Sequence, residues 1–79
     1  MNREMILASA EEDYNEAMED YTFVNREEAA RNAAVNAIVA GVWNAHGITC
    51  PVEAVGRDDV VEEIRSLKKE FGIYDEENN

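Results

Sequence analysis

Apolar residues recur at helical spacing in three stretches of the chain. In the first, residues 3–21, they stand three and four positions apart, which places them on one face of a helix. The stripe consists of Ile6, Leu7, Ala10, Tyr14, Ala17, Met18 and Tyr21. The pattern predicts an amphipathic helix over residues 3–21.

The second stretch, residues 26–46, is rich in alanine, the strongest helix former. Asn25, with Glu28 three positions later, matches a capping start, and Gly47 suits a helix end. Bulky side chains gather on one side and small ones on the other. The bulky side consists of Val35, Ile38, Val39, Val42 and Trp43, and the small side of Ala30, Ala33, Ala37, Ala40 and Gly41. We expect a central helix buried on both sides, with Trp43 mostly buried and its indole N–H near a polar partner.

A third helix is predicted to begin at a cap formed by Asp58 or Asp59 and to end at Gly72. Its core-facing positions are Val60, Ile64, Leu67 and Phe71. The connector 48–57 contains Pro51 and Gly56, which leaves two interpretations open, one helical turn or a short extended piece.

These elements predict an all-α fold, a small three-helix bundle with a central Ala-rich helix. The length of 79 residues suits one domain, which we place at residues 1–74, followed by a polar frayed tail at 75–79. We expect the third helix to pack its apolar seam against the bulky side of the second. The contacts predicted there are with Val35, Ile38, Val39 and Val42.

The charge balance narrows the classes of partner. Eighteen acidic residues oppose seven basic ones, a net charge of −11, which disfavours direct binding of nucleic acid. A membrane span is not expected, because Arg31 and several asparagines interrupt the longest helix. The lone Cys50 rules out an internal disulfide, and the first residues show no signal-peptide pattern. We therefore expect a cytoplasmic protein.

Few residues are of catalytic or metal-binding type. His46 and Cys50 stand four positions apart, yet no third orienting group accompanies them. We interpret His46 as a helix C-terminal residue and Cys50 as a small buried hydrophobe. Carboxylates of the first helix lack the Glu-x-x-His partners of di-iron bundles, and there is no glycine-rich phosphate loop. The sequence predicts no enzyme activity, no metal and no cofactor.

One surface of the first helix is predicted to be purely anionic. It carries Glu12, Asp13, Glu16, Glu19 and Asp20, here called the acidic face, with no basic residue among them. The third helix instead mixes signs, as in Glu62 with Arg65, which gains a few tenths of a kilocalorie per pair. The acidic face is either a solubility device or a surface for a basic partner.

The second interpretation leads to a functional hypothesis. Carboxylates about 5–6 Å apart on a helix are coarsely comparable to the phosphates of a nucleic-acid strand. In size and charge the chain is similar to small acidic proteins of phages and mobile elements that block restriction enzymes, CRISPR effectors or repair enzymes; the likeness rests on no motif. We predict an inhibitor that occupies the basic surface of a nucleic-acid-handling protein, with Met5, Phe23 and Tyr74 as candidate apolar anchors.

The alternative is an assembly module that forms a homodimer or a hetero-complex. Ala33, Ala37 and Gly41, the small-residue stripe, recur every four residues and allow close helix approach. The same stripe is equally explained if the first or third helix covers it within the monomer.

Overall fold

The computed structural model of the chain describes residues 2–73, which contain helices and no strand. In chain order the helices are α1 (Arg3–Glu19), α2 (Arg26–Ala45), α3 (Pro51–Ala54) and α4 (Asp58–Phe71). The predicted all-α fold is confirmed. Tyr74 and the predicted tail 75–79 lie outside the described residues.

Asparagine side chains start the two longest helices. Asn2 accepts a hydrogen bond from the Met5 N–H at 2.8 Å, and Asn25 accepts one from the Glu28 N–H at 3.1 Å. Each side chain satisfies a backbone donor that has no partner within its helix. The predicted start of the second helix is therefore confirmed, and His46 is its C-terminal cap, also as predicted.

The first helix ends two residues earlier than predicted. The Asp20 carboxylate accepts hydrogen bonds from the Thr22 N–H and hydroxyl, at 2.9 and 2.6 Å, and this local turn competes with another helical turn. Tyr21 is consequently 82% exposed and does not belong to the buried stripe. Its ring lies under the Arg26 guanidinium, 4.3 Å from the ring centroid.

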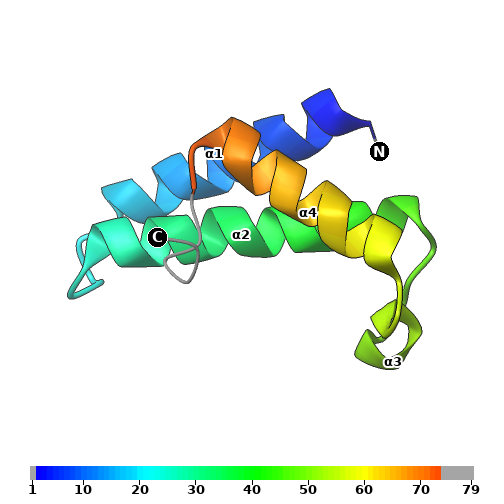
Figure 1. Cartoon of the computed structure of the whole chain (residues 1–79). Helices are drawn as coiled ribbons and strands as arrows, with labels where there is room; N and C mark the ends of the chain where they lie inside the picture. Colours follow the sequence, from blue (N-terminus) through cyan, green and yellow to red (C-terminus); the bar gives the residue numbers. More distant parts are fainter. Residues whose placement is uncertain (1, 74–79) are drawn as a thin grey trace.

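The connector between the second and third long helices contains one helical turn, α3, which begins with Pro51 and projects from the three long helices (Figure 1). Cys50, which directly precedes this turn in the chain, was predicted as a buried hydrophobe but is exposed. The cap of α4 is Arg57 rather than Asp58 or Asp59, and Gly72 ends the helix with φ +105°, a value that favours glycine.

The three long helices are in mutual contact. α1 and α2 lie side by side, and α4 packs across α2 and touches α1 (Figure 1). Tyr14 of α1 meets Phe71 of α4 edge to face, with centroids 5.9 Å apart, and Arg3 pairs with Glu70. Because α1 and α4 cover adjacent parts of one α2 face, the prediction that α2 is buried on both sides is wrong. Asn32 and Asn36 on its other side are exposed.

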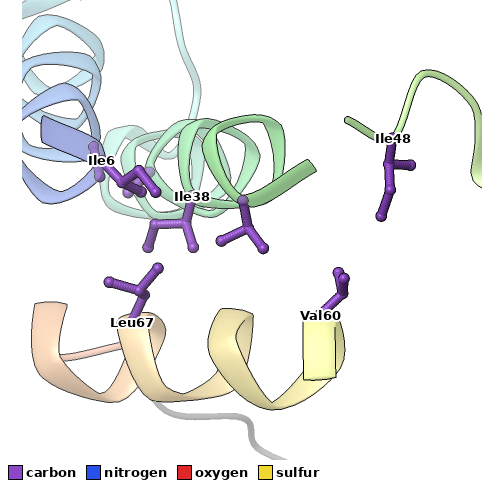
Figure 2. Packing of buried hydrophobic residues seen from close by; sticks show 8 residues of the cluster. Ile6, Ile38, Ile48, Val60 and Leu67 are labelled. Atoms are coloured by element: carbon purple, nitrogen blue, oxygen red, sulfur yellow. The ribbon is translucent and has the colours of Figure 1, made fainter. Parts of the chain in front are cut away.

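The core forms where these three helices meet, and Figure 2 shows Ile6, Ile38 and Leu67 directed toward one another. Its members are Ile6, Ala10, Ala34, Ile38, Val42, Ile48, Val60 and Leu67. Val35 and Val39, predicted to face the third helix, are only partly buried and lie outside this cluster. Trp43 is also only partly buried, and its indole N–H has no hydrogen bond within residues 2–73.

Gly41 lets α1 pack closely against α2. A methyl group built at its Cα would lie 2.8 Å from Ile6 Cγ1 and 3.2 Å from Ile6 Cγ2. Ile6 is itself 1% exposed, so it has little room to retreat. Glycine is therefore required here by packing against α1.

We expect Gly41→Ala to lower the free energy of unfolding by about 1–2 kcal/mol, because the clash outweighs a helix-propensity gain of about 1 kcal/mol. In an Ile6→Ala background the methyl group would have room. There the same substitution should stabilise the protein by up to about 1 kcal/mol. Urea denaturation of the four proteins measures both effects, and an unchanged sign in the two backgrounds would refute the close contact.

Candidate functional site

Part of the acidic face and the small-residue stripe border the same groove. Two adjoining hollows of about 260 and 350 Å³ lie between α1 and α2, and Asp13 lines both. The first is lined by Asp13, Glu16, Ala17, Asp20, Phe23 and Ala33. The second is lined by Ser9, Asp13, Ala37, Ala40, Gly41 and Asn44. We call the two together the α1–α2 groove.

The five carboxylates of the acidic face divide into two groups. Asp13, Glu16 and Asp20 line the α1–α2 groove. Glu12 and Glu19 are exposed on α1 and are not among its lining residues. The division follows from helix geometry, since residues three and four apart share one edge of a helix while their neighbours turn away from it.

Within the part of the chain that the structure describes, no basic side chain pairs with the acidic face. Across residues 2–73, the ion pairs of acidic side chains with Arg or His involve Asp59, Glu63 and Glu70, and none involves a carboxylate of this face. Arg26 is the nearest basic residue in sequence to Asp20. Its guanidinium donates to the Met18 carbonyl at 3.0 Å and stacks on Tyr21 instead. The carboxylates of the acidic face therefore have no ion-pair partner among residues 2–73.

Asp20 is held in its charged form by the turn that ends α1. The Thr22 hydroxyl donates to its carboxylate, the Thr22 N–H adds a second hydrogen bond, and both lower the pKa of Asp20. The carboxylate thus stays ionised to lower pH than an unbonded aspartate. Thr22 therefore both ends α1 and favours the charged form of Asp20, which lines the groove.

Exposed apolar side chains lie at the same end of the groove. Phe23, a predicted anchor, lines the groove and is 45% exposed. Tyr21 and Val24 beside it in the chain are exposed too, and the sequence had not singled them out as surface residues. Met5, another predicted anchor, is exposed on α1 but does not line the groove, and the third, Tyr74, lies outside the described residues.

The small-residue stripe is only partly available to a second protein. Ala33 and Ala37 are partly exposed in the groove, whereas Gly41 is buried against Ile6 of the same chain. Close packing of α1 on Gly41 is the reason. The prediction that Ala33, Ala37 and Gly41 form one exposed dimer face is therefore wrong for Gly41, which is buried.

His46 and Cys50 have separate partners. His46 Nε2 lies 2.7 Å from Glu63 Oε2, and its Nδ1 lies 3.5 Å from an Arg57 nitrogen and 3.8 Å from Asp59 Oδ2. The Cys50 thiol instead lies 3.6 Å from Glu53 Oε1. These contacts join the end of α2 to α4, and both imidazole nitrogens of His46 take part in them.

Asp59 gives the junction of α2 and α4 a dependence on pH. Hydrogen bonds from Arg57 lower the pKa of Asp59 from 3.8 to about 2. A lowered pKa means that the charged carboxylate stabilises the fold above about pH 4, and that this contribution is lost as the pH falls toward about 2.

Asp59→Asn should therefore be less stable than wild type at neutral pH, with the difference closing between about pH 4 and pH 2. Urea denaturation across this range tests it. Asp58→Asn is the charge-matched control, because it leaves the Arg57 hydrogen bonds intact.

Residues 2–73 contain no group of three His, Cys, Asp or Glu side chains gathered as a metal site. Over the same range no helix has the length and apolarity that crossing a membrane requires. No protein-family model, curated protein or solved structure matches the chain.

Proposed function

We propose that this protein is a non-enzymatic inhibitor whose acidic face occupies the basic, nucleic-acid-binding surface of a target protein. The observation that supports the proposal is the row Asp13, Glu16 and Asp20. It lines an open groove, has no basic side chain paired with it among residues 2–73, and ends beside exposed Phe23. Charge complementarity of this kind speeds encounter and selects partners, while a buried apolar anchor slows dissociation.

The spacing of the row suits a surface that binds phosphates. At 1.5 Å per residue, Asp13, Glu16 and Asp20 follow one another at about 4.5 and 6 Å along the helix axis. A groove whose lysines and arginines hold successive phosphates offers cations at comparable intervals. The chain would thus compete with nucleic acid for the target and would not bind nucleic acid itself, since its net charge is −11.

The setting that we propose follows from the same features. A lone, exposed Cys50 suits the reducing cytoplasm, and an acidic protein of this size suits an anti-restriction or anti-CRISPR role in a phage or mobile element. The alternative role as an assembly module has weaker support, because α1 covers Gly41. Sedimentation at two ionic strengths tests the homodimer form of this alternative, which would be a dimer at tens of micromolar.

Capture of the target from host lysate with matched charge variants tests the proposal. Glu12→Gln, Glu16→Gln and Glu19→Gln together remove three charges from exposed positions of the acidic face. The control, Glu4→Gln, Asp58→Asn and Glu62→Gln, removes three charges from exposed positions elsewhere. We expect wild type and control to retain a nucleic-acid-binding protein and the first variant to lose it. Equal capture by all three would reduce the acidic face to a solubility device.

A further inference from the structure

Exposed apolar side chains lie next to one end of the α1–α2 groove. Tyr21, Phe23 and Val24 form an exposed apolar tip at the connection between α1 and α2, and Phe23 continues it into the groove. Large apolar side chains grouped on the surface of a small acidic protein mark a contact with another macromolecule. A purely ionic ligand would leave this tip without a function.

The shape of the groove suits a helix. The α2 side of its floor consists of the small side chains of Ala33, Ala37 and Ala40, so no long side chain of α2 fills it. Small residues at such spacing let a further helix backbone approach closely. From Ala33 to Asn44 the groove follows α2 for about 16 Å, which corresponds to about eleven residues of a docked helix.

Charge is distributed unequally across the groove. The α1 wall carries Asp13, Glu16 and Asp20, and the α2 wall ends in the uncharged Asn44. A helix lying along this wall would match the carboxylates with basic residues at offsets of three and seven positions. A second copy of the chain, with a net charge of −11, and nucleic acid are both repelled by the same carboxylates.

We infer that the groove receives one basic amphipathic helix of the target protein. Lysines or arginines along one edge of that helix pair with Asp13, Glu16 and Asp20, and its apolar face packs on Phe23 and the alanine floor. This inference rests on the proposed function and specifies how the target is bound. The mode is a helix in a groove, with anchors spaced by helical turns.

Two synthetic peptides of about sixteen residues test the inference on the full ¹⁵N-labelled chain. One is an amphipathic helix with a leucine and alanine face and lysines along one edge; the other has the same composition in scrambled order. We expect the first peptide to shift the amide signals of Asp13, Glu16, Phe23, Ala33 and Ala37, and to bind at least about tenfold more tightly than the scrambled peptide.

Single substitutions locate the binding site. Phe23→Ala should weaken binding of the amphipathic peptide about tenfold, and Val61→Ala, exposed to 47% against 45% for Phe23, should leave it unchanged. Circular dichroism verifies that both variants are folded. Asp13→Asn with Glu16→Gln should reduce the salt dependence of binding.

Several results would overturn the inference: equal affinity for both peptides, shifts confined to Glu12 and Glu19 or to α3, no effect of Phe23→Ala, or self-association that blocks the groove. Loss of target capture in the three-glutamine variant, combined with failure of the peptide, would leave the proposed function standing through the outer carboxylates. Only the helix in the groove would then be excluded.

Discussion

Replacing Ile38 with alanine should lower the free energy of unfolding by about 2–5 kcal/mol. Ile38 is fully buried and lies beside Ile6 and Leu67 at the meeting point of the three long helices (Figure 2). Truncation removes apolar contacts and leaves a cavity that rigid helices close only in part. For a chain of 79 residues the total stability is expected to be roughly 4–12 kcal/mol, so this single change removes a large share of it.

Thermal or urea unfolding measures the loss. A midpoint that falls by more than about 8 °C agrees with it, and a fall of one or two degrees would show that Ile38 is not a core residue. Val61→Ala, a truncation at an exposed position of α4, is the control and should change stability by no more than about 0.5 kcal/mol.

The second large effect concerns the rate of target binding. At low salt, Glu12→Gln, Glu16→Gln and Glu19→Gln together should slow association with the captured target about tenfold or more. The dissociation rate should change less, because it depends more on Phe23 and the groove. Exposed charges are screened beyond about 8 Å at physiological salt. The association rate of the wild type should therefore fall toward that of the variant as salt is added.

Stopped-flow or surface-based kinetics at several salt concentrations measures these rates. The variant with Glu4→Gln, Asp58→Asn and Glu62→Gln carries the same net charge and is the control. If both variants slow association equally, net charge alone steers the encounter and the acidic face has no special part in it.

Helix type and most helix ends were predictable because local signals specify them. Asn25 caps α2, and Gly72 ends α4 with a left-handed backbone. The early end of α1 was missed because the apolar spacing continues to Tyr21, whereas the hydrogen bonds between Thr22 and Asp20 favour a turn. An aspartate two residues before a threonine was the available signal.

The groove was not predictable in the same way. The sequence indicates the acidic face and the small-residue stripe separately, but their meeting depends on how α1 is rotated against α2. That rotation follows from the fit of Ile6 over Gly41, a tertiary contact between residues 35 positions apart in the chain. Likewise, the partial burial of Val39 depends on α1 and α4 sharing one face of α2.

Competition between this protein and nucleic acid for the captured target is the most direct test. A fluorescent oligonucleotide bound to the target should be displaced as the protein is added, to completion at one chain per nucleic-acid site, with no species that contains all three. The variant lacking Glu12, Glu16 and Glu19 should displace it only at much higher concentration. A stable ternary complex, in which oligonucleotide and protein bind the target together, would contradict the proposal that the acidic face occupies the nucleic-acid surface.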